Sequence, residues 1–252
     1  ASYTAIKADM SSAAIYGFDE DDFQLSAENL RFEYASAAAD RTVIDYEASF
    51  DGGLTLGSNG DVVIDFTTKK LGVYAEKATL SISKFLYFSG AIGFEQADYG
   101  STLKAGSTGL LPVMNATGFS IGGSNITAFV GYAEDGIDST QTLQAQKDSL
   151  YGFGVEGVNF GFLSLKDSSG KTYKALKAHA DNMAVYGFDP NDFQLSVSDL
   201  NIEYNSASIP GNELNFTVLD GGKLAIPTGD PKKPVELDFS GKRHGVFAGN
   251  VT

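Results

Sequence analysis

Two acidic turns hold the side chains of this sequence that are best suited to bind a metal ion. They contain Asp19, Asp21, Asp22, Asp189, Asn191 and Asp192. Each turn places several oxygens on nearly consecutive positions, and a hard cation such as Ca²⁺ takes about six to eight oxygen ligands. We therefore take these residues as candidate calcium ligands and Ca²⁺ as the candidate cofactor. The alternative is a solvated turn closed by hydrogen bonds to the carboxylate of Asp19 or Asp189.

Other residue types with catalytic potential give no pattern. His179 and His244 are the two histidines, and their counterparts in the first of two sequence copies, described below, are Asp9 and Leu71. A catalytic or metal role would thus exist in one copy only, so we interpret both as surface or partly buried residues. The 32 acidic residues always offer carboxylate pairs, but nothing selects one pair. No nucleophile elbow, zinc-protease motif or phosphate-binding loop occurs. We expect no catalytic residues, no bound organic cofactor and no enzymatic activity.

The acidic turns belong to a sequence repeat. Residues 16–26, YGFDEDDFQLS, return as residues 186–196, YGFDPNDFQLS. The match extends without a gap from 3–37 to 173–207, with about half of the positions identical. Repetition at a long fixed period is the mark of a tandem array. The sequence predicts one complete unit over residues 1–172 and the first half of a second unit over residues 173–252.

Hydrophobic alternation predicts strands throughout. In residues 23–34, Leu30, Phe32 and Tyr34 share one face and Arg31 and Glu33 the other, which is the period of a strand with one buried face. A helix over 22–30 is the alternative there. Residues 160–165 and 173–178, with the turn between them, make the clearest hairpin. Strands are also expected in 42–50 and around 214–218, and a long loop with a short strand in 89–115.

These patterns predict an all-β fold of elongated antiparallel repeats packed in series, as a β-sandwich-like meander or alternatively a β-solenoid. Each unit should bury part of its apolar face against the next. The repeated aromatics are expected in the core: Tyr16, Phe18, Phe23, Tyr34, Tyr186, Phe188, Phe193 and Tyr204. The alternative is an exposed aromatic stripe that binds sugar or protein.

The bulk composition excludes some partners. The formal net charge is −14, so the surface repels nucleic-acid phosphates and we expect no nucleic-acid partner. No stretch reaches the roughly 18 apolar residues of a membrane span. Cysteine is absent, which alone does not define a compartment. The chain begins with Ala1 and has no visible signal peptide, so we expect a piece of a longer or processed protein.

The repeated YGFDxxDFQLS segment, in acidic, cysteine-free, β-rich units of well over a hundred residues, resembles the tandem repeats of very large secreted bacterial surface proteins, including giant adhesins. The resemblance covers the whole chain at the level of architecture. It implies an extracellular or cell-surface location and a structural or adhesive role as a spacer, fibre or matrix element. Neighbouring repeats would then be the main partners. The alternative function is a surface module that binds carbohydrate or another protein.

Overall fold

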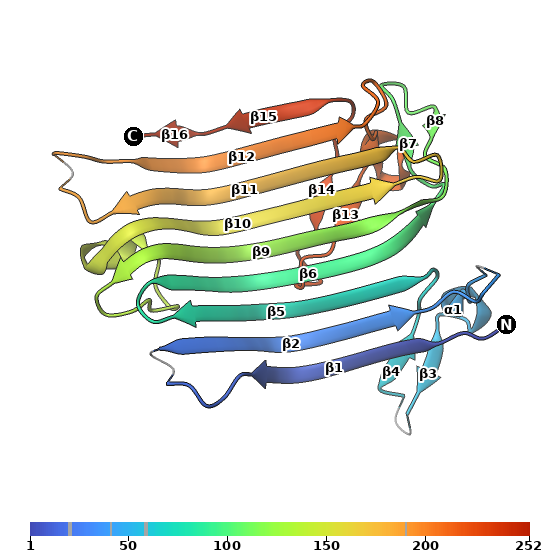
Figure 1. Cartoon of the computed structure of the whole chain (residues 1–252), viewed down its shortest axis with the longest axis horizontal. Helices are drawn as coiled ribbons and strands as arrows, with labels where there is room; N and C mark the ends of the chain where they lie inside the picture. Colours follow the sequence, from blue (N-terminus) through green and yellow to red (C-terminus); the bar gives the residue numbers. More distant parts are fainter. Residues whose placement is uncertain (20–21, 41, 58–59, 190) are drawn as a thin grey trace.

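Ten strands of the described residues form one large antiparallel sheet in the computed structural model, which describes residues 1–19, 22–40, 42–57, 60–189 and 191–252 (Figure 1). The order across the sheet is β1-β2-β5-β6-β9-β10-β11-β12-β15, and β16 also pairs with β12. The strands are β1 Ala5–Ala14, β2 Phe23–Ala35, β5 Lys70–Ile82, β6 Leu86–Gly100, β9 Ala116–Ala133, β10 Leu150–Lys166, β11 Thr172–Tyr186, β12 Ser196–Ala207, β15 Arg243–Phe247 and β16 Asn250–Val251. Sheet neighbours follow one another along the chain, so the sheet is a meander.

Small elements lie in the connections between the long strands. The β2–β5 connection holds α1 Tyr46–Ser49, β3 Leu54–Leu56 and β4 Val62–Ile64. The β6–β9 connection holds β7 Lys104–Ala105 and β8 Leu111–Pro112, and the β9–β10 connection holds the 3-10 helix η1 Gln144–Ser149. The last holds two 3-10 helices, η2 Phe216–Val218 and η3 Asp220–Gly222, followed by β13 Leu224–Ile226 and β14 Val235–Leu237. No helix within the described ranges is long and apolar enough to cross a membrane.

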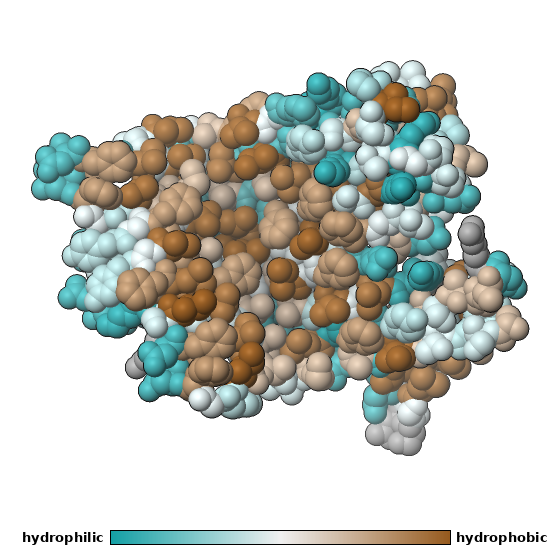
Figure 2. All heavy atoms as spheres, viewed as in Figure 1, coloured by the Kyte–Doolittle hydropathy of each residue, from teal (hydrophilic) through white to brown (hydrophobic). Residues whose placement is uncertain are grey.

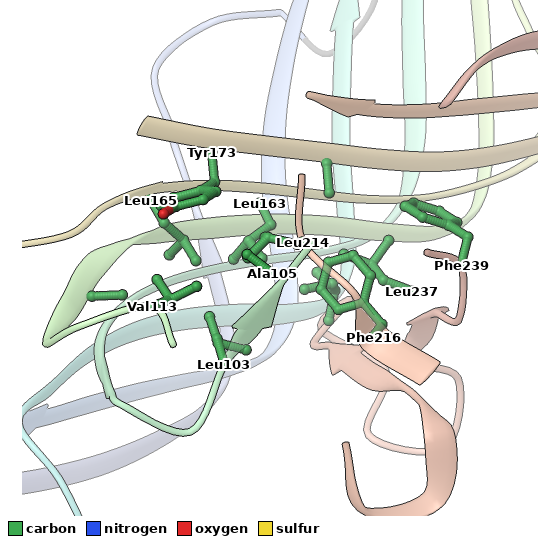
Figure 3. Close-up of a cluster of buried hydrophobic side chains, with 13 residues drawn as sticks. Leu103, Ala105, Val113, Leu163, Leu165, Tyr173, Leu214, Phe216, Leu237 and Phe239 are labelled. Atoms are coloured by element: carbon green, nitrogen blue, oxygen red, sulfur yellow. The ribbon is translucent and has the colours of Figure 1, made fainter. Parts of the chain in front are cut away.

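The connections cover one face of the sheet, which we call the covered face. Buried side chains from β10 and β11 pack there against residues of the 101–115 and 208–242 connections (Figure 3). This cluster contains Leu103, Ala105, Val113, Ala116, Leu163, Leu165, Tyr173, Ala175, Leu214, Phe216, Ile226, Leu237 and Phe239. A second cluster, which includes Tyr87, Phe129 and Leu143, is built under the β9–β10 connection. These two clusters supply most of the buried apolar core.

The opposite side, which we call the open face, is also apolar. Residues that alternate with the covered-face positions point to it. Four rows of paired residues run across it, through Phe94, Ile92, Phe88 and Leu86, and they contain no Asp, Glu, Lys or Arg. Most of their large side chains are half-buried or exposed: Leu25, Leu30, Phe32, Val73, Leu80, Phe88, Ile92, Phe94, Ile121, Val155, Phe160, Phe162, Leu176, Met183 and Ile202. The aromatic rings of Phe94, Phe119 and Phe162 follow one another at 6.1 and 6.0 Å.

The all-β antiparallel prediction is confirmed, as is the hairpin of 160–165 with 173–178, which pairs Phe160 with Ala178. Residues 23–34 form a strand and not a helix. Three local expectations were wrong. Residues 42–50 contain α1 because Asp45 caps it by accepting from the Ala48 amide. Residues 216–218 form a 3-10 turn, and residues 89–100 continue the long strand β6.

The two units share apolar burial as expected, since buried side chains of the second unit pack with Leu163 and Leu165 of the first. The first unit contributes β1, β2, β5, β6, β9 and β10, and the second contributes β11, β12, β15 and β16. Because β11 simply continues the sheet after β10, the two units are joined edge to edge by strand pairing (Figure 1).

Candidate functional site

The junction between the two units is a strand ladder that keeps one register from end to end. β10 and β11 pair from Gly152 opposite Tyr186 to Lys166 opposite Thr172. This register is as extensive as the ladders inside the first unit, such as that of β6 with β9. Backbone hydrogen bonds therefore hold the two units together as firmly as they hold neighbouring strands within one unit.

Asp167 organises the tight turn at this junction. Its buried Oδ1 accepts hydrogen bonds from the Ser169 amide at 2.9 Å and the Lys171 amide at 3.0 Å, and Oδ2 accepts from the Tyr173 hydroxyl at 3.1 Å. Burial alone would raise the pKa of Asp167, but the hydrogen bonds from Ser169, Lys171 and Tyr173 outweigh it and hold the pKa below its ordinary value. Burial and the bond to Asp167 raise the pKa of Tyr173 to about 12.

The β13–β14 hairpin of the second unit reaches back across the junction onto the first unit. It contacts β9 and β10 on the covered face, and Figure 1 shows it behind these strands. Gly93, Gly122 and Gly161 lie opposite one another on β6, β9 and β10, directly beneath it. We call these three residues the glycine track.

The glycine track makes room for the backbone of the hairpin. A Cβ atom added at Gly122 would lie 2.3 Å from the Pro227 carbonyl oxygen, and one at Gly93 would lie 2.8 Å from the same atom. A Cβ at Gly161 would lie 3.0 Å from the Ile226 Cβ. Glycine is thus required here for close backbone approach, not for a left-handed conformation. The hairpin then seats Ile226 in the main cluster, where it is 1% exposed.

The two copies build the same local structure around the junction and the N-terminal edge. Lys7 pairs with Asp65 at 3.2 Å, and their counterparts Lys177 and Asp238 pair at 2.7 Å. The cluster of Tyr46, Ile64 and Phe66 corresponds to Phe216, Leu237 and Phe239. In the first copy this cluster includes Ala35 and packs against Ala5, Ile44 and Leu54, whereas in the second it merges with side chains of β10. The second copy is therefore completed by the unit before it.

A buried ion cluster occupies the covered face of the first unit. The Lys70 ammonium lies 2.7 Å from Glu33 and 3.2 Å from Glu95, and the Tyr74 hydroxyl donates to Glu95 at 2.6 Å. Burial alone would lower the pKa of Lys70, but the Glu95 and Glu33 carboxylates outweigh it and raise the pKa. The counterpart ion pair, Arg243 with Glu203, has an N–O distance of 3.9 Å. Each buried carboxylate is matched by a cation or hydroxyl, which is the arrangement of a structural cluster.

The predicted calcium ligands lie at the hairpin turns that join β1 to β2 and β11 to β12. In the second turn the Asp189 carboxylate accepts from the Asn191 amide at 2.8 Å and its side-chain nitrogen at 2.9 Å. The Phe193 and Asp192 amides donate to the Asp189 carbonyl oxygen, and the Phe23 and Asp22 amides donate to that of Asp19. Asp21 lies outside the described residues.

Over the residues that the structure describes, no three His, Asp or Glu side chains form a group that could hold a metal ion. Calcium binding at these turns stays a prediction. Thermal unfolding with Ca²⁺ and with a chelator tests it, and identical midpoints would remove it.

His179 lies on the covered face of β11, beside acidic and amide groups. Its Nε2 is 3.0 Å from Asp181 Oδ1, and its Nδ1 is 3.2 Å from Asn201 Oδ1. Burial alone would lower the pKa of His179. The contacts with Asp181 and Asn201 outweigh burial and raise the pKa above its ordinary value. His244 stacks on Tyr204 at 4.9 Å. Both contacts agree with the interpretation of these residues as surface or partly buried.

The repeated aromatic residues at the β1–β2 and β11–β12 turns, which we call the tip aromatics, were expected in the core. This expectation was wrong for most of them. Tyr16 is 88% exposed, and Phe18 and Phe188 are 63% and 59% exposed. Each phenylalanine instead packs edge-on against the next aromatic of its own turn, Phe23 or Phe193. Tyr186 alone of these tip residues is buried, at 7% exposure, because it packs against the β9–β10 connection.

Sequence reasoning missed the glycine track. Its signal was present as a glycine directly after an apolar residue in three strands, in Ile92-Gly93-Phe94, Ile121-Gly122-Gly123 and Phe160-Gly161-Phe162. Only the strand register shows that these glycines are neighbours.

No protein-family profile matches the chain, and neither a curated protein nor a solved structure matches it.

Proposed function

We propose that this chain is a structural repeat segment, in which successive units extend one continuous sheet edge to edge. The observation that carries the proposal is the junction itself. Its β10–β11 ladder joins the units without a linker, and the β13–β14 hairpin of one unit lies on the glycine track of the other. Such a joint fixes the relative orientation of units, as a spacer, fibre or matrix element requires.

The geometry sets how much each unit lengthens the array. The period of 170 residues between Tyr16 and Tyr186 contains six long strands. Neighbouring strands lie about 4.8 Å apart, so each unit adds roughly 29 Å perpendicular to the strands. The resemblance to repeats of secreted surface proteins supports an extracellular or cell-surface location. A catalytic activity is not part of this proposal.

A lengthened chain tests the proposal. A second copy of residues 3–172 would be inserted after residue 172, so that two ladders of the β10–β11 type are formed. We expect small-angle scattering to show one rigid particle whose width perpendicular to the strands grows by roughly 29 Å. The matched control carries Ile6→Pro in the inserted copy, where Ile6 takes the place of Leu176 at the new junction and a ladder hydrogen bond is lost. Two independently tumbling bodies in the unsubstituted protein would refute the proposal.

The exposed aromatic tips favour a second candidate function, which is binding of a carbohydrate or a protein. Phe18 and Phe188 occupy equivalent exposed positions beside acidic residues at the same end of the sheet. Repetition of an exposed aromatic side chain in each unit would provide a multivalent binding surface. A glycan array with the native chain and with Phe18→Ser/Phe188→Ser tests this function. Reproducible binding that the double substitution abolishes would favour it over a purely structural role.

A further inference from the structure

The open face of the sheet is an uncovered apolar surface of unusual size. The described part of the chain covers the opposite face, where Gly93 and Gly122 meet Pro227, whereas the adjacent residues Phe94 and Ile121 point away from the hairpin. Figure 2 shows this side as a nearly continuous field of apolar atoms over the strands, with hydrophilic atoms gathered at the loops. Monomeric soluble proteins rarely expose a contiguous apolar patch larger than a few hundred Å².

The total accessible surface of the chain is also larger than its mass predicts. The accessible surface is 13833 Å². A compact monomer of 26.6 kDa exposes about 10,700 Å² by the relation between surface and mass. The chain therefore exposes roughly 3,000 Å² more than its mass requires. Nine strands abreast, at about 4.8 Å spacing and about 45 Å of length, give an open face of roughly 1,700 Å².

This area matches what a stable dimer needs. A standard protein interface buries about 800 Å² on each partner, and obligate homodimers bury more. The open face offers about twice that standard area per copy. Obligate interfaces are also apolar at their centre and poor in charged residues. The open face is similar, because its four rows contain no Asp, Glu, Lys or Arg and hold His244 only at the edge.

The charge distribution favours a second copy as the occupant. The net charge of −14 opposes self-association through surfaces that carry this charge. Charged groups such as Lys7, Glu33, Glu95 and Lys177 lie on the covered face, in the strand positions that alternate with the open-face residues. Packing through the open faces would keep those charges on the outer sides of both sheets. Two sheets of the same twist also match in shape, because such sheets pack about 10 Å apart with strands within roughly 30° of each other.

We propose that two copies of this chain pack through their open faces and form a two-layer β-sandwich. The pairing does not depend on how units are joined along the chain. The central strand of the nine is β9, and Ile121 lies in the middle of its apolar row. In a two-fold symmetric sandwich whose axis runs along β9, between the two sheets, Ile121 lies close to that axis and faces its own counterpart.

Sedimentation of the whole chain tests the proposal. We expect a species of twice 26.6 kDa at micromolar concentration. Ile121→Lys and Ile121→Glu each place two like charges near the axis and should weaken the dimer by roughly 100-fold or more. An equimolar mixture of the two variants should recover a dimer, which misfolded protein could not do. Leu110→Lys is the matched control, because Leu110 is exposed in the β7–β8 turn and its substitution should leave the dimer intact.

Circular dichroism confirms that each variant remains folded. If Ile121→Lys unfolds the chain, Val73→Lys replaces it, since Val73 is 44% exposed in the same row and tolerates a long side chain. A folded native chain that stays monomeric at 100 micromolar would overturn the proposal. A dimer that survives the charge substitutions would also overturn it. A monomer that binds detergent through this face would assign the face to an amphiphile instead.

Discussion

Replacing Gly122 by alanine should unseat the hairpin that crosses the unit junction. The new Cβ atom would lie 2.3 Å from the Pro227 carbonyl oxygen and 2.9 Å from its carbon. Both are backbone atoms, so no side-chain rotation relieves the contact. The oxygen must retreat by roughly 1 Å before the contact becomes tolerable, and Ile226, the next residue, must move with it.

Two opposing effects set the change in the free energy of unfolding that Gly122→Ala causes. Alanine in a strand is favoured over glycine by about 0.5–1 kcal/mol, because glycine loses more chain entropy on folding. Overpacking a close contact costs about 1–3 kcal/mol. The steric term is the larger because the obstructing atoms belong to the main chain. We expect the free energy of unfolding to fall by about 1–2 kcal/mol, which lowers Tm by roughly 2–8 °C in a chain of this size.

Urea unfolding gives the free energy, and hydrogen exchange at the Ile226 and Leu237 amides shows whether the hairpin itself loosens. Gly245→Ala is the matched control. A Cβ there would lie 2.6 Å from the ring of Phe247, but that ring is 60% exposed and can rotate away. Its effect should stay within about 0.5 kcal/mol. If Gly122→Ala were as stable as the native chain, or destabilised it no more than Gly245→Ala, the close-approach reasoning would be refuted.

The remaining predictions concern the junction turn and the clusters. The folded pKa of Asp167 lies below 3.8, the unperturbed value, so its contribution is present above about pH 4 and is lost as the pH falls through the folded pKa. Asp167→Asn should flatten the decline of stability in acid, measured by urea unfolding from pH 6 to pH 2; an unchanged slope would contradict this. Phe216→Ala should cost about 3–5 kcal/mol, since Phe216 is buried against Phe239, whereas Phe18→Ser should cost under about 0.5 kcal/mol. Comparable losses in the two would show that the tip is packed.

A strand supplied from outside should pair with the free edge of β1. β1 is the counterpart of β11. β11 pairs with β12 on one side and with β10 on the other, whereas β1 pairs with β2 on one side only. A peptide with the sequence of residues 150–166 should therefore add to that edge in the register of the junction, and protect β1 amides from hydrogen exchange. A scrambled peptide of the same composition is the control. Equal protection by both peptides, or none, would contradict the equivalence of the two edges.

Part of the candidate site could be read from the sequence, and part could not. The 170-residue period showed that the sequence repeats, and the predicted hairpin of 160–165 with 173–178 is present. The alternation at Leu30, Phe32 and Tyr34 identified a strand with two different faces. The glycine track was not predictable, because its three members are 29 and 39 positions apart in sequence and meet only through register. The tip aromatics were misplaced because hydrophobicity alone does not distinguish a core residue from one at an exposed hairpin end.

The sequence by itself determined that the chain is a repeated, antiparallel β protein, because periodicity of two and long-range identity are properties of the chain alone. Only the tertiary structure decided how the units join. An apolar strand face can be buried against another unit or left for another molecule, and the same alternation serves both arrangements. In the folded chain the connecting loops and the β13–β14 hairpin, which packs against Gly122, lie on the same side of the sheet. One apolar face is therefore covered and the other is open.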